Sequence, residues 1–288
     1  MPVQIIRQLS GLRERTRLIR ESGQTIALVP TMGALHQGHM ALVELARRQA
    51  DHVIVSLFVN PRQFGPNEDF EKYPRSEDAD AARLADAGVT ALWMPSVSEI
   101  YPEGFSTSVV VDGLDDVLCG AARPGHFEGV ATIVAKLFNQ VRPDIAVFGE
   151  KDWQQLVIIR RMVRDLDIEV ELVGMPILRD TDGLALSSRN AYLSGAERKA
   201  ALALPQSLQQ AVAEIEGGED IATSLVAAKE RLLSAGFGSV DYVALVDAGS
   251  LEPLETLDRE ARLLGAARIG ATRLIDNFAV RPKNRTHR

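Results

Sequence analysis

The chain alternates between short apolar runs and helical patterns, and this alternation limits its possible folds more than any other feature. Residues 25–29 form an apolar run that predicts a buried strand, and Pro30 ends it. Gly33 and Gly38 then mark a loop in which the backbone can turn tightly. From residue 40 to residue 49 the apolar spacing is helical. The unit is therefore strand, glycine-bearing loop and helix.

The same order repeats along the first part of the chain. Further strands are predicted at residues 51–59, 89–94, 109–112, 144–148 and 168–173. Helices are predicted at residues 3–22, 76–87, 129–140 and 153–165, and a second glycine-containing loop at residues 118–128. Strands that alternate with helices form parallel sheets with right-handed crossovers. We therefore expect a doubly wound, Rossmann-like α/β domain.

The pattern changes in the last third of the chain. Two helical patterns, at 196–216 and 220–235, come before strand patterns at 241–246, 261–269 and 273–275. Helices followed by a few strands are typical of α+β domains. We therefore predict a Rossmann-like domain over residues 1–182 and a smaller α+β domain over residues 183–288.

Composition excludes several classes of function. The charged residues are 32 basic and 39 acidic, so the formal net charge is −7, which argues against general nucleic-acid binding. The single cysteine excludes an internal disulfide framework and fits a reducing cytosol. No leader pattern and no membrane-spanning apolar run are visible. We expect a cytoplasmic protein that binds small molecules, neither nucleic acid nor a membrane.

Three loops follow predicted strands of the sheet. They span residues 30–39, 60–64 and 149–152. Ligands of doubly wound sheets bind at the carboxyl ends of the strands, so we expect these loops to converge on one crevice.

Two histidines lie in the first of these loops. His36 and His39 are three residues apart near the start of a predicted helix, where free N–H groups and the helix dipole attract anions. The pair therefore suggests a site for phosphate, and more narrowly for the triphosphate of a nucleotide. Zinc is the weaker interpretation, because no third ligand stands at a helical spacing from the pair. An ordinary polar helix start explains the local pattern equally well.

The other candidates are ambiguous when each is taken alone. Lys151 could meet a phosphate and Asp152 a ribose hydroxyl, but acidic residues are common at helix starts. Ser187, Ser188 and Arg189 suit a polyphosphate, although a polar linker has the same composition.

Two neutral amides and three acids complete the candidates. Gln63 and Gln155 could bind hydroxyls or the carboxylate of a small substrate, although most glutamines are simply surface residues. Glu77, Asp78 and Asp80 could hold Mg²⁺, but a solvated helix face is the better interpretation of these acids.

Two common nucleotide motifs do not occur in the sequence. It contains neither Gly-x-x-x-x-Gly-Lys-Ser/Thr nor Gly-x-Gly-x-x-Gly after a strand. A P-loop kinase and an ordinary dinucleotide dehydrogenase are therefore improbable.

Five separate motifs, in this order, together resemble the pantoate–β-alanine ligase (pantothenate synthetase) family. They are Pro30-Thr-Met-Gly-Ala-Leu-His-Gln-Gly-His39, Phe58-Val-Asn-Pro-Arg-Gln-Phe64, Arg123-Pro-Gly-His-Phe127, Phe148-Gly-Glu-Lys-Asp152 with Gln154-Gln155, and Asp182-Gly-Leu-Ala-Leu-Ser-Ser-Arg-Asn190. The likeness extends more loosely to Arg273-Leu-Ile-Asp-Asn277. His36-Gln-Gly-His39 is also similar to the "HIGH" tetrapeptide of a nucleotidyltransferase superfamily.

The resemblance implies a two-step, ATP-dependent ligation in a homodimer that uses Mg²⁺. Pantoate would attack the α-phosphate of ATP, and β-alanine would then attack the pantoyl adenylate. The implied ATP-binding residues are Met32, Gly33, Ala34, Leu35, His36, Gln37, Gly38, His39, Gly149, Glu150, Lys151, Asp152, Leu178, Leu186, Ser187, Ser188 and Arg189. Gln63 and Gln155 would hold pantoate, with Gln63 also near β-alanine. The expected catalytic residues are His36, His39, Lys151 and Arg189, and metal ligands are not implied.

Two alternatives remain at this stage. A nucleotidyltransferase acting on a phosphate-bearing substrate would share the histidine motif but would not need the two glutamines. A nucleotide sensor of the same fold would bind ATP and release nothing, so a turnover assay separates it. In a ligase, the adenylate must be kept from water, and the C-terminal part carrying Arg189 is the expected lid.

Overall fold

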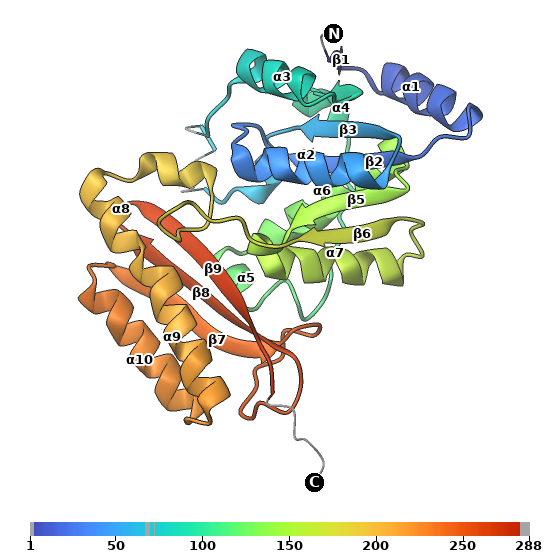
Figure 1. Cartoon of the computed structure of the whole chain (residues 1–288). Helices are drawn as coiled ribbons and strands as arrows, with labels where there is room; N and C mark the ends of the chain where they lie inside the picture. Colours follow the sequence, from blue (N-terminus) through green and yellow to red (C-terminus); the bar gives the residue numbers. More distant parts are fainter. Residues whose placement is uncertain (1–2, 67–69, 72, 283–288) are drawn as a thin grey trace. The chain divides into compact units, whose positions relative to one another are not determined.

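The computed structural model describes residues 3–66, 70–71 and 73–282 (Figure 1). Its contacts divide the chain into two compact units. The first consists of Met1–Glu150 with Ile158–Pro176, and the second of Lys151–Val157 with Ile177–Arg288. The domains predicted at residues 1–182 and 183–288 stay a prediction, because a grouping of contacts does not test which segments fold on their own.

The first unit carries the alternating elements that the sequence predicts. They are β1 (Gln4–Ile6), α1 (Leu9–Glu21), β2 (Ile26–Thr31), α2 (Gln37–Gln49), β3 (His52–Leu57), the 3₁₀ turn η1 (Pro61–Gln63), α3 (Glu77–Asp86), β4 (Ala91–Trp93), α4 (Val97–Ile100), α5 (Cys119–Ala122), α6 (His126–Val141), β5 (Ile145–Gly149) and β6 (Glu171–Met175). The turn η2 (Glu150–Asp152) and helix α7 (Trp153–Asp165) contain residues of both units.

Strands β1 to β6 pair in the order β1-β4-β3-β2-β5-β6, and each pairing between neighbours is parallel. The predicted doubly wound α/β fold is confirmed. From β2 the chain builds the sheet outward through β3 and β4, and it later returns to the other side of β2 with β5 and β6. The direction of winding therefore reverses between β2 and β5, which is the usual ligand position in such sheets.

Strand β2 is buried on both faces. Ala27 and Val29 pack with Leu42 and Val43 of α2 in one apolar cluster. Ile26 and Leu28 point to the opposite face because side chains alternate along a strand, and both are fully buried. Helices therefore cover both faces, as parallel sheets require, and α2 crosses one of them (Figure 1).

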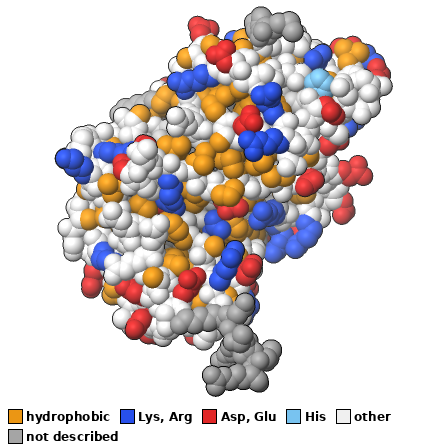
Figure 2. Space-filling view, in the orientation of Figure 1, with side chains coloured by type: hydrophobic (Ala, Val, Ile, Leu, Met, Phe, Trp, Pro, Cys, Tyr) orange, Lys and Arg blue, Asp and Glu red, His pale blue; other side chains and the backbone are white. Residues whose placement is uncertain are grey.

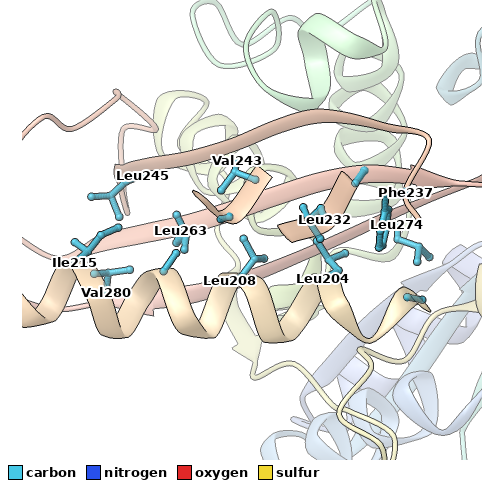
Figure 3. Packing of buried hydrophobic residues seen from close by; sticks show 14 of the residues in the cluster. Leu204, Leu208, Ile215, Leu232, Phe237, Val243, Leu245, Leu263, Leu274 and Val280 are labelled. Carbon is cyan, nitrogen blue, oxygen red and sulfur yellow. The ribbon is translucent and has the colours of Figure 1, made fainter. Parts of the chain in front are cut away.

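The second unit is an antiparallel sheet packed against helices. Its elements are η3 (Ser188–Tyr192), α8 (Gly195–Ala201), α9 (Ala203–Gly217), α10 (Ile221–Ser234), β7 (Ser239–Asp247), β8 (Ala261–Ile269) and β9 (Thr272–Val280). The sheet order is β7-β8-β9. Figure 3 shows Leu204, Leu208 and Ile215 of α9 pointing toward the sheet, where they join one apolar cluster with Leu263 and Val280. The predicted α+β character of this part is therefore confirmed.

Three local predictions are wrong. Residues 3–22 do not form one helix, because residues 4–6 pair in parallel with β4 and only residues from 9 onward turn into α1. Residues 109–112 form no strand, and the Val109 N–H bonds to Thr132 Oγ1 instead of to a neighbouring strand. Residues 118–128 are not one loop but contain α5 and the start of α6.

Charges of both signs are interspersed on the face seen in Figure 2. Among the described residues, no helix is both long enough and apolar enough to cross a membrane.

Candidate active site

The three loops predicted to form a site follow neighbouring strands. Since β3, β2 and β5 are adjacent in the sheet, their carboxyl ends lie side by side. These ends lead into Asn60, the segment 32–36 and Glu150. Within the first unit, the structure therefore brings together the beginnings of all three loops at the point where the winding reverses.

The two histidines cap the N-terminus of α2. His36 is the N-cap residue, and its Nδ1 accepts from the Gly38 N–H at 3.1 Å. The His36 N–H in turn donates to His39 Nδ1 at 3.3 Å, and the ring centroids are 4.1 Å apart. Since both Nδ1 atoms accept, each neutral ring carries its proton on Nε2. The pair therefore holds two Nε2–H donors at a helix end that already favours anions.

A buried carboxylate holds the loop before these histidines. Asp80 of α3 is 1% exposed and accepts from the N–H groups of Ala34 and Leu35, both at 2.9 Å. Ala34 has a φ of 51°, a conformation that is uncommon for a non-glycine residue. Arg83 of the same helix donates to the Leu35 carbonyl. Helix α3 thus fixes the backbone of the loop from both its N–H and its C=O side.

The interpretation of this helix as a solvated acidic face is therefore wrong for Asp80, whose burial depends on N–H donors about 45 positions earlier in the chain. It holds for Glu77 and Asp78, which are exposed, and Glu77 pairs with Arg7 at 3.0 Å.

The second loop orients a buried glutamine. Asn60 Oδ1 accepts from the Arg62 N–H at 3.2 Å and from the Tyr101 hydroxyl at 2.8 Å. Asn60 Nδ2 therefore faces the other way, and it donates to the Gly129 carbonyl and to Gln63 Oε1, both at 3.0 Å. Because the Gln63 oxygen is the atom that meets Asn60, its NH₂ is the end that can donate to a ligand.

Helix α6 anchors the backbone of this glutamine. His126 Nδ1 lies 2.8 Å from the Gln63 carbonyl, and Arg123 donates to the same oxygen at 3.2 Å. Arg123 also lies 2.9 Å from His126 Nε2. Since a guanidinium only donates, Nε2 is the acceptor and Nδ1 carries the proton. The close packing requires Gly129, where a Cβ would stand 2.2 Å from the Arg62 carbonyl oxygen.

In the second unit, the segment around Lys151 is tied to β9. Asn277 donates to the Lys151 carbonyl at 2.9 Å and accepts from Arg262 at 2.6 Å. The Arg262 guanidinium lies over the Trp153 ring, 3.8 Å from its centroid. The backbone of Lys151 is thus held through its carbonyl, and its side chain is half-buried.

A short hairpin carries two of the remaining predicted ATP ligands. The Leu186 N–H donates to the Leu178 carbonyl at 2.9 Å, so the structure brings these two predicted residues together. Arg179 forms a two-bond ion pair with the buried carboxylate of Asp276, at 2.6 and 2.9 Å, and this pair fixes the hairpin on β9.

The predicted phosphate ligands that follow the hairpin lie on one tight turn. The Ser187 hydroxyl accepts from the Arg189 N–H at 3.3 Å and begins η3. Ser187, Ser188 and Arg189 are therefore held close together within the second unit.

The other predicted residues differ in exposure. Met32, Gly38, Gly149, Glu150 and Gln155 are half-buried, and Gln37 and Asp152 are exposed. Sequence reasoning assigned no role to Asn60, Tyr101, Asp276 or Asn277. Asn60, Asp276 and Asn277 lie inside the segments that carry the family resemblance, which was a usable signal, whereas nothing near Tyr101 in the sequence marks it.

Among the described residues, no group of three or more His, Cys, Asp or Glu side chains could hold a metal ion.

Comparison with known proteins decides the family. The family model described as Pantoate-beta-alanine ligase matches residues 4–279. The chain belongs to the pantoate–β-alanine ligase family. The resemblance inferred from the five motifs is thereby confirmed.

Relatives of this family match the chain over almost its whole length. "Pantothenate synthetase" from Rhizorhabdus wittichii is 60% identical over 280 residues, which are 97% of this chain and 99% of the relative. "Pantothenate synthetase" from Sphingopyxis alaskensis is 60% identical over 278 residues, 96% of this chain and 100% of the relative.

Solved structures of the family share the fold. Pantothenate synthetase from Thermus thermophilus has a TM-score of 0.91 and 47% identity, and the match covers 97% of this chain and 100% of the Thermus chain. The pantoate-beta-alanine ligase from Francisella tularensis, solved in complex with Beta-gamma ATP and Beta-alanine, has a TM-score of 0.81 and 34% identity. That match covers 96% of this chain and 97% of the Francisella chain. As a member of the pantoate–β-alanine ligase family, this chain is an ATP-dependent enzyme that condenses pantoate with β-alanine to pantothenate.

Proposed function

We propose that the first unit binds the phosphates of ATP at the N-terminus of α2 and pantoate at Gln63. The observation that carries this proposal is the pair of Nε2–H donors of His36 and His39 at the reversal point of the sheet. Residues 32–39 supply the phosphate site, and the NH₂ of Gln63 supplies a donor for an oxygen of pantoate.

The reaction has two steps whose demands differ. A pantoate carboxylate oxygen attacks the α-phosphorus of ATP, the bond to the β-phosphate oxygen breaks, and pyrophosphate leaves. The amine of β-alanine then attacks the acyl carbon, AMP leaves with the anhydride oxygen, and the amine loses a proton to solvent. A carboxylate with a pKa of ~4 is already ionised at neutral pH, so the first step needs no strong base.

The first step needs in-line placement and stabilisation of negative charge on the phosphates. Fixed donors at a helix N-terminus supply both. We assign His39 the role of a hydrogen-bond donor through Nε2, because protonating its Nδ1 would break the bond from the His36 N–H. In this assignment His39 does not carry a proton through the reaction.

For the other predicted residues we propose roles one by one. Lys151 and Arg189 bring positive charge to the phosphates, and Ser187 and Ser188 bring hydroxyl donors. Leu178 and Leu186 contribute backbone groups of the hairpin, where the Leu186 N–H bonds to the Leu178 carbonyl at 2.9 Å. Gly149, Glu150 and Asp152 contact the nucleotide, and Gln155 holds pantoate together with Gln63.

Three further features belong to the proposal. Mg²⁺ enters with ATP, bound to its phosphates, as a part of that substrate. The enzyme works as a homodimer, which light scattering would test. It works in the cytoplasm, where a chain with one cysteine stays reduced.

Product analysis tests the proposal. ATP, Mg²⁺, pantoate and β-alanine are supplied together and then with each omitted in turn. We expect AMP, pyrophosphate and pantothenate only with the full set, and pantoate-dependent ATP–pyrophosphate exchange without β-alanine. ATP binding without any AMP would overturn the assignment and favour a sensor.

Substitution of His39 tests the phosphate site itself. His39→Ala is expected to slow pantoate-dependent exchange about a hundredfold, the size of losing one fixed donor to a charged transition state. His52→Gln is the matched control, because His52 lies on β3 and contacts Thr90 and Gln24. Exchange at the wild-type rate in His39→Ala would contradict the assignment.

Substitution of Gln155 tests the pantoate site. Gln155→Ala is expected to raise the KM for pantoate and to leave the KM for ATP unchanged. A rise in the KM for ATP alone would mean that Gln155 belongs to the nucleotide.

A further inference from the structure

A buried network sets the direction of the Gln63 amide, and Tyr101 stands at its far end. The Tyr101 hydroxyl donates to Asn60 Oδ1 at 2.8 Å, and Asn60 Nδ2 donates to Gln63 Oε1 at 3.0 Å. Asn60 is 0% exposed and Gln63 is 9% exposed, so water competes little for these bonds. The three side chains form one directed chain of hydrogen bonds.

The ring of Tyr101 is held in place on several sides. Its centroid lies 5.0 Å from that of Phe105 and 6.2 Å from that of Phe58. The Arg62 guanidinium lies 5.7 Å from the ring centroid, and Glu128 binds that guanidinium at 2.9 Å. A phenol held in this way has little freedom to turn its hydroxyl away from Asn60.

The hydroxyl stays protonated under any ordinary assay condition. Burial raises the pKa of Tyr101 to about 12, and this effect outweighs the opposing influence of Arg62. The hydroxyl therefore donates to Asn60 throughout the neutral and mildly alkaline range.

The alternative orientation of Asn60 is disfavoured by its neighbours. If the Asn60 amide turned over, its NH₂ would face the Arg62 N–H, which can only donate, and the Tyr101 hydroxyl would have to turn from donor to acceptor. Its oxygen would then face the Gly129 carbonyl. With Asn60 reversed, Gln63 would have to present its NH₂ to Asn60 and its oxygen to the ligand.

We propose that Tyr101 is a positioning residue which, through Asn60, holds Gln63 with its NH₂ toward pantoate. The proposal rests on the proposed function, in which Gln63 contacts pantoate. This orientation makes Gln63 selective, because an NH₂ that faces the ligand binds carboxylate or hydroxyl oxygens and does not bind an ammonium group. Tyr101 itself need not touch any substrate.

A double-mutant cycle tests this role. The variants are Tyr101→Phe, Gln63→Ala and the double variant, each assayed for kcat and for the KM of pantoate and of ATP. Tyr101→Phe is expected to raise the pantoate KM about 3- to 10-fold, the size of one buried hydrogen bond, with kcat and the ATP KM nearly unchanged. In the Gln63→Ala background, the same substitution is expected to change the pantoate KM less than about 2-fold.

The control removes a phenol hydroxyl elsewhere. Tyr242 lies on β7 of the second unit, and Tyr242→Phe is expected to leave kcat, the pantoate KM and the ATP KM unchanged. Asn60→Asp is a second variant, because it replaces the Nδ2 donor by an oxygen that faces Gln63 Oε1. It is expected to raise the pantoate KM more than Tyr101→Phe does.

The outcomes separate the two proposals. An unchanged pantoate KM in Tyr101→Phe, or an equal rise in both backgrounds, would overturn the positioning role and leave Gln63 as a pantoate ligand. An unchanged pantoate KM in Gln63→Ala would instead overturn the proposed function of Gln63. A loss of kcat with no change in the pantoate KM would also contradict the positioning role.

Discussion

The two proposed ligand loops of the first unit are held in different ways. The loop before His36 is held by charged side chains of α3, since Asp80 accepts two backbone N–H groups and Arg83 donates to a carbonyl. The loop of Gln63 is held through the side-chain amide of Asn60 and, at its own carbonyl, by His126 and the Arg123 guanidinium. The first arrangement fixes where the backbone runs, and the second fixes which way a side-chain amide points.

This difference fits what each proposed ligand would require. Phosphate is bound by donors of any kind that stand at the right place, so the position of the backbone is decisive. Pantoate has to be distinguished from similar small molecules, so the direction of each hydrogen bond matters more. Breaking the contacts from α3 should therefore reduce stability and ATP chemistry, whereas breaking the contacts around Gln63 should reduce recognition of pantoate.

The largest effect is expected from Asp80→Ala. The substitution leaves the half-buried N–H of Ala34 and the buried N–H of Leu35 without their acceptor, which costs about 3 kcal/mol or more of unfolding free energy. Urea unfolding measures the loss, and ATP–pyrophosphate exchange should fall with it. Asp78→Ala on the exposed face of α3 is the control. Equal stability of the two variants would remove the distinction between the loops.

A smaller effect is expected from Gly129→Ala. The added Cβ would stand 2.2 Å from the Arg62 carbonyl oxygen, so α6 and η1 must separate, at a cost of about 1–3 kcal/mol. The pantoate KM should rise more than the ATP KM. Gly195→Ala is the control, because a Cβ there meets nothing within 4 Å. A change in the ATP KM alone would contradict the comparison.

The smallest effect is expected from His126→Ala. It removes one contact to the Gln63 carbonyl while Arg123 still donates to that oxygen at 3.2 Å. The pantoate KM should rise only about 2- to 5-fold, as expected for one of two hydrogen bonds to the same acceptor. Steady-state kinetics at saturating ATP measures the change. A larger rise of the pantoate KM than in Gly129→Ala would show that the His126 ring, and not the packing of α6, holds the Gln63 loop in place.

The sequence predicted the architecture better than the details of the elements. The apolar runs at β2, β3 and β5 are visible as local patterns, and their alternation with helices predicted the parallel sheet. Residues 4–6 were misassigned to a helix because only pairing with β4, far along the chain, makes them a strand. Periodicity within a short window cannot detect such a partner.

The candidate site also contains residues that the sequence marked and residues that it did not. The motifs marked the histidines and Gln63, and the structure places His36 and His39 together at the helix start. They did not mark Asp80, which looks like one acid among several on a helix. Its role depends on N–H groups 45 and 46 positions away, so no local pattern could reveal it.

The sequence by itself determined the family and the alternation of strands and helices along the first part of the chain, and it marked the residues proposed to meet ATP and pantoate. The tertiary structure alone decided which nitrogen of His36 and of His39 accepts a backbone N–H, which end of Gln63 meets Asn60 and which acid is buried. The physical reason is that the direction of a hydrogen bond depends on neighbours in space. For Gln63 the neighbour in space is Asn60, which is itself oriented by the Arg62 N–H, by the Gly129 carbonyl and by Tyr101, 41 positions away in the chain.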